Sequence, residues 1–236
     1  MPAVEIGKHL RTNQAIKRIL QYAAGLVVFI LIALVIIKNT SYRLPLDVDY
    51  LKLRRGPPST SQLKVGPCSE KSCPAGTFSF FVSSGAANVV APKICIENKM
   101  VLGAVQNNAG AGINVVILNG RDLTVVKVGD FNMYSGEVQP LIEFLQGLEK
   151  GNIVLMATFD DPATKLNDEA RNLIEGLGSS LIKSVGFRDT WVFVGGKGDL
   201  GKSTFEKHNK NNQATNKYDG WPEILQMDGC IPLYHE

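Results

Sequence analysis

An uninterrupted apolar run near the N-terminus constrains this chain more than any other feature. It extends from Ile19 to Ile37, and no strongly polar side chain occurs between Ala23 and Ile37. A helix needs about 20 consecutive apolar residues to cross a hydrocarbon layer about 30 Å thick. A buried core helix is a poor alternative, because no face of this segment is polar. The run therefore predicts a segment for membrane insertion or export.

The residues that flank the run indicate its orientation. Residues 1–18 form a basic tail, and lysines and arginines favour the cytoplasmic side of a membrane. The sequence KNTSYR follows the run and contains no A-x-A-like cleavage site. We expect residues 19–37 to be the uncleaved signal anchor of a type II membrane protein, with a cleaved signal peptide as the alternative. Both interpretations place the rest of the chain in the endoplasmic reticulum and Golgi or outside the cell.

The cysteines agree with export. All four lie beyond the apolar run, at Cys68, Cys73, Cys95 and Cys230. An even number of cysteines in an exported chain is typical of a disulfide framework, and four cysteines allow three pairings. Zinc is the alternative, but zinc ligands cluster at CxxC-like or Cys/His spacings, which this sequence lacks. We therefore expect disulfides, no metal site and no cofactor.

Residues 38–67 mix proline, charge and short polar runs without helical periodicity, so they are expected to form a flexible stalk. The stalk contains a basic cluster that ends in Arg54 and Arg55 and is followed by Gly56 and two prolines. An exposed cluster of this kind is a candidate cutting site for a convertase or a trypsin-like protease. The alternative is that these side chains are merely solvated.

Residues 68–236 are expected to form one compact, mixed α/β domain. Hydrophobic residues make up 44% of the chain and charged residues 20%, which allows a packed core. The net charge is +3, and much of the excess lies in the basic tail, so no nucleic-acid partner is indicated. β-Branched and aromatic runs predict strands at 78–82, 92–97, 113–120, 123–128, 152–159 and 190–195.

Two segments of the domain have helical features. Apolar residues at helical spacing predict an amphipathic helix within 136–151. A second helix is expected to begin after Asn167, a suitable N-cap, and to stop near Gly178. The tail after the last expected strand reads as polar loop until about residue 220.

The segment Gly196–Ser203 matches the phosphate-loop pattern G-x-x-x-x-G-K-[ST] and follows an apolar strand. Phosphate binding of this kind also needs a helix after the loop, whose N-terminus completes the anion site. The residues after Ser203 have no apolar period, and too few of them remain for the other units of a nucleotide-binding sheet. A nucleotide-binding enzyme is therefore only a remote alternative.

Four motifs resemble one known family. SGAANVVAPKICIENK, FDDPATKLNDEAR, GFRDTWVFVGGKG and NKYDGWPEILQMDGCIP closely resemble, in the same order, the secreted cytokine-like "family with sequence similarity three". The resemblance runs from about Cys68 to Pro232 and does not cover the stalk or the apolar run. It implies a disulfide-stapled β-β-α globule and an extracellular, non-enzymatic function. It also implies the pairs Cys68–Cys95 and Cys73–Cys230, of which the second would close a long loop.

The same region is similar to the stem module of an O-mannose-type N-acetylglucosaminyltransferase, in which an aspartate and two arginines bind sugar. Two of these positions match Asp160 and Arg188 here, and the third falls on Ala111. Charged groups are well suited to bidentate hydrogen bonds with ligands, but the alternative is an ion pair between Asp160 and Arg188 that stabilises the fold. Asp161 is expected to cap the turn through Pro162.

The two tryptophans, Trp191 and Trp221, are expected to belong to the core rather than to a sugar platform. No Ser/His/Asp set, metal cluster or pair of catalytic carboxylates is legible in the sequence. The sequence thus favours a non-enzymatic, cytokine-like signalling protein that binds an extracellular receptor. The alternative is a lectin-like carbohydrate-binding module that uses Asp160 and Arg188.

Overall fold

The computed structural model describes most of the chain after Cys68 and part of the apolar run. The described residues are 21–23, 25–32, 34–35, 68, 71–198 and 201–234. The chain divides into two compact units, Met1–Ser61 and Gln62–Glu236. The stalk and the Arg54–Arg55 cluster lie outside the described residues, so their expected roles stay predictions.

In the first unit, the described residues between 21 and 35 are helical and exposed. Among the described parts of the chain, no helix is both long and apolar enough to cross a membrane. Several residues of the expected anchor at 19–37 fall outside the described set. The anchor therefore stays a prediction.

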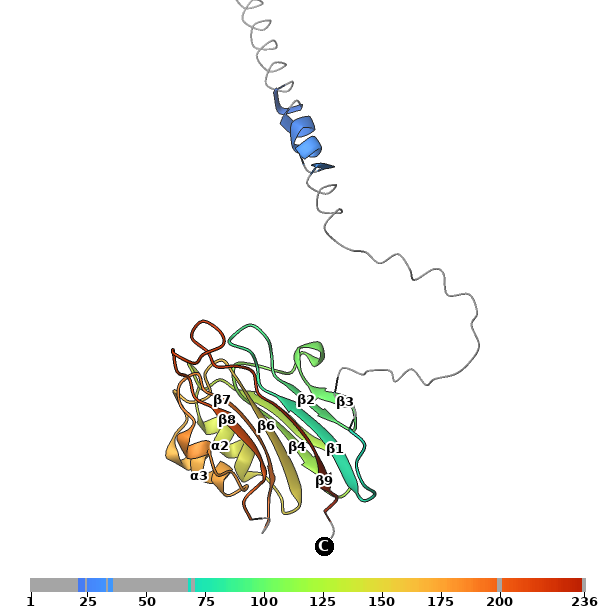
Figure 1. The fold of residues 1–236 in the computed structure, drawn as a ribbon, viewed down its shortest axis with the longest axis vertical. Coiled ribbons are helices and arrows are strands. Elements are labelled where there is room, and N and C mark those ends of the chain that lie inside the picture. Colours follow the sequence, from blue (N-terminus) through green and yellow to red (C-terminus); the bar gives the residue numbers. More distant parts are fainter. Residues whose placement is uncertain are drawn as a thin grey trace, which may run out of the picture. The chain divides into compact units, whose positions relative to one another are not determined.

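The second unit is built on two antiparallel sheets (Figure 1). The first sheet has four strands in the order β3-β2-β1-β9, and the second has five in the order β5-β4-β6-β7-β8. The first sheet contains β1 (Thr77–Ser83), β2 (Lys93–Ile96), β3 (Lys99–Leu102) and β9 (Gln226–Pro232). The second contains β4 (Gly112–Asn119), β5 (Val125–Phe131), β6 (Asn152–Phe159), β7 (Thr190–Gly196) and β8 (Phe205–Asn209).

The five-stranded sheet is the middle of three layers. Alternate residues of a strand point to opposite faces of the sheet. On β4, Val115 and Ile117 pack with α2 (Gln139–Gln146) and α3 (Asp168–Glu175) in one buried cluster. Val116, between them, packs toward the four-stranded sheet in the other cluster. Figure 1 shows α2 and α3 on one side of this sheet and β1, β2 and β9 on the other. This arrangement is the β-β-α layering that the family resemblance implies.

The layering explains why the central strands are largely apolar on both faces. Six consecutive residues of β6 are buried, because helices cover one face and a second sheet covers the other. Trp191 on β7 is fully buried in the helix-facing cluster, as expected from the sequence. Each strand that the sequence predicts is present, and β4 and β5 form the expected hairpin.

Both expected helices are present but shorter than the sequence patterns suggest. α2 has proline in its first turn and ends at Gln146, with Gly147 as its C-cap, so it covers only the middle of 136–151. α3 begins after Asn167, whose side-chain oxygen accepts a hydrogen bond from the Ala170 N–H at 2.9 Å. It ends at Glu175, before the expected stop at Gly178.

The expectation of a polar, loop-like tail is wrong in one place. Residues Phe205–Asn209 form β8, which pairs with β7 along the edge of the five-stranded sheet. The strand lacks apolar alternation because two of its side chains, Glu206 and His208, are partly buried polar groups with specific partners. Sequence patterning also missed β3, a short edge strand.

Two disulfides link the four-stranded sheet to the segment that precedes it. Cys68 is bonded to Cys95 on β2, and Cys73 is bonded to Cys230 on β9. These are the pairs that the family resemblance implies. All four sulfurs are thereby used, which excludes the zinc alternative for these cysteines. Among the described residues, no group of histidines, cysteines and carboxylates could hold a metal ion.

Candidate functional site: a polar corner at the ends of β6 and β7

The strand register brings the three family-related positions to one end of the five-stranded sheet. Gly112, the first residue of β4, pairs with Phe159, the last residue of β6, so Ala111 before β4 and Asp160 after β6 lie at the same end of the sheet. The pairing of β6 with β7 likewise carries Asp161 and Arg188 to the same edge. We call Asp160, Asp161, Arg188 and Trp221 the polar corner. Ala111, Asp160 and Arg188 therefore lie at the same end of this sheet.

Asp160 has backbone strain and no side-chain partner in the described part of the chain. Its φ is 58°, in the left-handed region that aspartate tolerates better than most residues. Its N–H donates to the carbonyl of Ala87 at 3.1 Å, and Ala87 also has a positive φ, of 50°. Asp160 is half-buried, and no ion pair joins it to Arg188 among the described residues. The fold-stabilising ion pair considered from the sequence is therefore not found.

Asp161 is buried and holds the backbone of the corner. One carboxylate oxygen, Oδ1, accepts hydrogen bonds from the N–H of Ala163 at 3.0 Å and from the N–H of Arg188 at 3.3 Å. The first bond closes the turn through Pro162, as the sequence predicts. The second ties the end of β6 to the start of β7. Asp161 therefore has a structural function in addition to any contact with a ligand.

Arg188 is held against aromatic rings instead of a carboxylate. Its guanidinium carbon lies 4.0 Å from the centroid of the Trp221 ring and 4.9 Å from that of Phe187. Such cation–π contacts orient the guanidinium without using its N–H donors. Gly220 makes room for this stack, because a Cβ there would lie 3.0 Å from an Arg188 nitrogen.

Trp221 corrects a prediction from the sequence. It belongs to neither hydrophobic cluster and is only half-buried, so it is not a core residue. Its ring is a platform under Arg188 (cation–π distance 4.0 Å). The sequence signal that pointed to this role was weak: a tryptophan after glycine in a polar tail, away from any strand.

The corner contains an unusual concentration of unpaired polar atoms. Asp161 Oδ2, Arg188 Nε and Trp221 Nε1 are buried and have no hydrogen-bond partner among the described residues. A buried polar atom without a partner costs about 1–3 kcal/mol. A native fold usually pairs such atoms, so a group of them deserves a functional explanation. Here they combine an acceptor with two donors, a set that complements a ligand rich in hydroxyl or amide groups.

Asp189, which the sequence did not single out, differs from these unpaired atoms because both of its carboxylate oxygens have hydrogen-bond partners. Its Oδ2 lies 2.7 Å from His208 Nε2 and accepts from the N–H of Gly186, and its Oδ1 accepts from the N–H of Asn211. Burial alone would raise the pKa of this carboxyl, but the hydrogen bonds from His208, Asn211 and Gly186 outweigh burial and hold the pKa below its usual value. The cluster fixes the loop that carries Arg188.

Ala111 lies in a loop whose shape depends on its glycine neighbours. A Cβ at Gly110 would lie 2.1 Å from an Asp130 oxygen, and Gly112 has a φ of 98° with no space for a side chain. The buried Asn114 amide bonds to both the N–H and the carbonyl of Gly110. Position 111 is thus presented by a well-defined turn, and alanine there offers no polar group.

The phosphate-loop match is not supported by its surroundings. After Ser203 the chain enters β8 at Phe205, an antiparallel strand, where a phosphate site needs the N-terminus of a helix. The Ser203 hydroxyl instead bonds to the carbonyl of Val194 and accepts from the N–H of Phe205. The segment is the connection of a β-hairpin.

Fold and corner together define a class: a disulfide-bonded, sheet-rich β-β-α domain with no legible catalytic set in its described residues. A family model described as "Interleukin-like EMT inducer" matches residues 111–199. Protein FAM3C of Danio rerio is 58% identical over 166 residues, which cover 70% of this chain and 73% of that protein. Human Protein FAM3C is 57% identical over 162 residues (69% and 71%), and human Protein FAM3D is 49% identical over 181 (76% and 81%). The chain belongs to the FAM3 family, whose members are cytokine-like.

Proposed function

We propose that this chain is a secreted, cytokine-like signalling protein that acts by binding an extracellular partner and not by catalysis. Family membership carries the proposal, since relatives more than half identical to this chain cover most of its length, and the matching family model is named for an interleukin-like inducer. The disulfides are consistent with an extracellular location. The apolar run at 19–37 would direct export, as an anchor or as a signal peptide.

The polar corner is the surface through which we propose that the partner binds. It combines left-handed backbone at Asp160 and Arg188, an exposed aromatic ring at Phe187, and buried polar atoms that have no partner in the described part of the chain. Backbone strain tends to collect at binding sites, where the surrounding fold holds it in place. Arginine and aromatic side chains are also the residues that contribute most to protein interfaces.

A cell-binding measurement tests this proposal. Labelled, secreted protein should bind saturably to responsive cells, and Arg188→Ala should weaken binding about tenfold to a hundredfold, as expected for loss of a charge-assisted hydrogen bond. Arg121→Ala, in the turn between β4 and β5, is the matched control and should bind like the parent. Equal binding by both variants would exclude the corner as the receptor surface.

A second candidate function is carbohydrate binding at the same corner. The observation that favours it is the chemistry of the unpaired atoms, an aspartate oxygen and two N–H donors beside the Trp221 ring. Sugars present hydroxyl groups on their edges and C–H groups on their faces, which such a set complements. The missing third charge at Ala111 would limit affinity.

A glycan array distinguishes the two functions. If the corner binds sugar, Ala111→Arg should strengthen binding about tenfold, because it adds one charge-assisted donor, and Arg188→Ala should abolish it. Absence of any bound glycan, or binding that Arg188→Ala leaves unchanged, would exclude the lectin function. Receptor binding that persists on deglycosylated cells would then favour a protein partner.

A further inference from the structure

The opposite ends of β6 and β7 enclose a pocket that the polar corner does not explain. The pocket has a volume of about 550 Å³, which is within the range of small-molecule sites, about 300–1,000 Å³. It is formed by the start of β6, the end of β7, the start of β8, and the end of β9 with the two residues after it. Its lining residues include Ile153, Val194, Phe205, Ile231 and Leu233, which belong to or pack against the cluster between the two sheets. The apolar layer between the sheets is thus open at this end.

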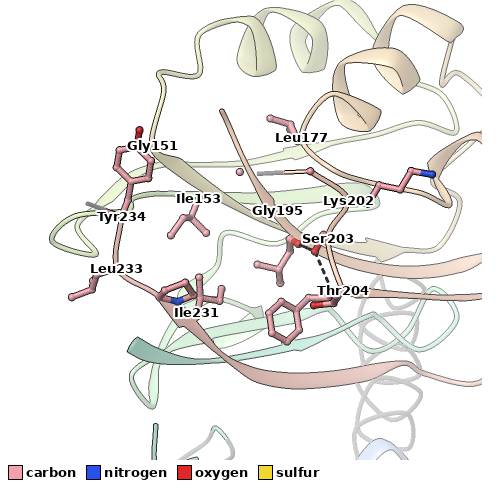
Figure 2. Close-up of a pocket in the computed structure, with 15 residues that line it drawn as sticks. Gly151, Ile153, Leu177, Gly195, Lys202, Ser203, Thr204, Ile231, Leu233 and Tyr234 are labelled. Carbon is pink, nitrogen blue, oxygen red and sulfur yellow. Dashed lines mark hydrogen bonds between the residues drawn. The ribbon is translucent and has the colours of Figure 1, made fainter. Parts of the chain in front are cut away.

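Glycines keep the pocket open. Gly151, Gly195, Gly196 and Gly201 form parts of its wall and contribute no side chains. At Gly195 a Cβ would lie 2.3 Å from the carbonyl oxygen of Leu177, so this position excludes larger residues. A Cβ at Gly151 would lie 2.9 Å from the Tyr234 ring, which packs over this wall (Figure 2). The hollow is therefore a consequence of residues that the local packing requires.

The far wall of the pocket is held in place covalently and by the backbone. Ile231 follows Cys230, which is bonded to Cys73. The Leu233 N–H donates to the carbonyl of Gly76 at 3.0 Å, and the Tyr234 N–H donates to that of Gly120 at 2.8 Å. A wall fixed in this way stays apart from β8 without a ligand, and a preformed site binds its ligand at lower entropic cost.

The mouth of the pocket is basic. Lys202 lines the pocket and is exposed, and Figure 2 shows its ammonium group extending away from the apolar side chains. Lys150 and Lys197 are exposed neighbours of the lining residues Gly151 and Gly196, while Glu149 is the nearest acidic residue in that turn. An apolar interior with Lys202 at its rim is suited to a ligand with an apolar chain and an anionic head group.

We propose that this pocket binds an anionic, single-chain amphiphile, such as a medium- or long-chain fatty acid. The chain would lie between Ile153, Phe205 and Leu233, and the carboxylate would remain at the mouth, near Lys202. Exposing this much concave apolar surface to water is unfavourable, and burial of an acyl chain removes that cost. The proposal is independent of the polar corner at the other end of the strands.

Calorimetric titration of the full chain tests the proposal with octanoate, decanoate and dodecanoate, all below their micelle concentrations. Affinity should rise about tenfold for each two methylenes that the pocket covers. Dodecyltrimethylammonium, which has the same chain and a cationic head, should bind more weakly than dodecanoate. Lys202→Gln should reduce that preference about twofold to fivefold, the effect of one exposed ion pair.

Two tryptophan variants separate the pocket from other apolar surfaces of the chain. Leu233→Trp fills the pocket and should weaken dodecanoate binding at least about tenfold, as loss of two or more buried methylenes predicts. Val105→Trp adds the same ring at a position that is 85% exposed and outside the pocket, so it should bind like the parent. Thr204→Trp, on an exposed part of the opposite wall, replaces Leu233→Trp if that variant does not fold.

Three results would overturn the proposal. The first is dodecanoate binding that neither filling variant weakens. The second is equal or tighter binding of the cationic amphiphile. The third is a dimer that Leu233→Trp dissociates, with no binding of dodecanoate, which would identify a second copy of the chain as the occupant.

Discussion

Arg188 and Asp189 are adjacent in the chain, but their side chains are placed in opposite ways. Asp189 is 5% exposed and receives hydrogen bonds from His208, Gly186 and Asn211. Arg188 stacks on Trp221, and its Nε has no partner among the described residues. Both carboxylate oxygens of Asp189 are hydrogen-bonded within the domain, whereas the Nε of Arg188 has no partner in the described part of the chain.

The difference teaches how to separate a structural charge from a candidate binding charge. A buried carboxylate with three donors stabilises the fold, and its removal leaves those donors unpaired. A half-buried guanidinium on an aromatic platform adds little stability but is already oriented for a ligand. Asp189 therefore holds the loop, and Arg188 presents its donors from it.

The largest expected effect is the loss of stability when the Asp189 carboxylate is removed. Asp189→Ala should lower the free energy of unfolding by about 3–5 kcal/mol, because it removes a buried acceptor and leaves its hydrogen-bond partners on His208, Gly186 and Asn211 unpaired. Urea denaturation followed by fluorescence measures the change. Asp160→Ala is the matched control at the same end of the domain and should cost less than about 1 kcal/mol, since its carboxylate has no partner among the described residues. Equal losses would remove the distinction between the two groups.

Acid should act on the Asp189 cluster in a defined direction. Although burial opposes it, hydrogen bonding from His208, Asn211 and Gly186 lowers the pKa of Asp189 in the folded state from the ordinary value of 3.8. The resulting stabilisation is present above about pH 3.8 and is lost as pH falls through the lower pKa of the folded state. Unfolding midpoints measured from about pH 5 to about pH 2 should fall more for the parent than for Asp189→Asn. Parallel curves for the two proteins would contradict the assignment.

The smallest expected loss of stability is that of the Arg188 variant. Arg188→Ala should cost about 0.5–1 kcal/mol of stability, the value of an exposed cation–π contact. The same variant should lose most partner binding, so stability and binding would be separated in one residue. A loss above about 3 kcal/mol would instead place Arg188 among the structural charges, with Asp189.

The sequence predicted the interior of this domain well, because burial leaves a simple pattern. The run at 153–157 is apolar throughout, and β6 is covered on both faces. β8 was missed for the converse reason: Glu206 and His208 point to partners that lie far away in the sequence, Trp191 and Asp189. A strand stabilised by long-range polar contacts has no local apolar signature.

The candidate site was predicted only in part. Asp160 and Arg188 came from a resemblance, and the strand register shows that their positions share one end of the sheet. The Trp221 platform depends on a tertiary contact across the polar tail, which no periodicity encodes. The apolar pocket likewise arises from segments of β6, β8 and the chain after β9 that meet only in the folded domain.

The bridge between Cys73 and Cys230, separated by 157 positions in the sequence, also determines how the domain responds to mechanical tension. A force applied at Cys68 and at the last residues passes through this bond and leaves the enclosed chain unloaded. While the bond is intact, only the residues after Cys230, which pair with the start of β1, could be peeled from the sheet. Reduction of the Cys73–Cys230 bond would allow the chain between these residues to extend by about 500 Å, at about 3.3–3.6 Å for each residue. The domain, pulled at Cys68 and at Tyr234, would therefore extend little until a reductant breaks this bond.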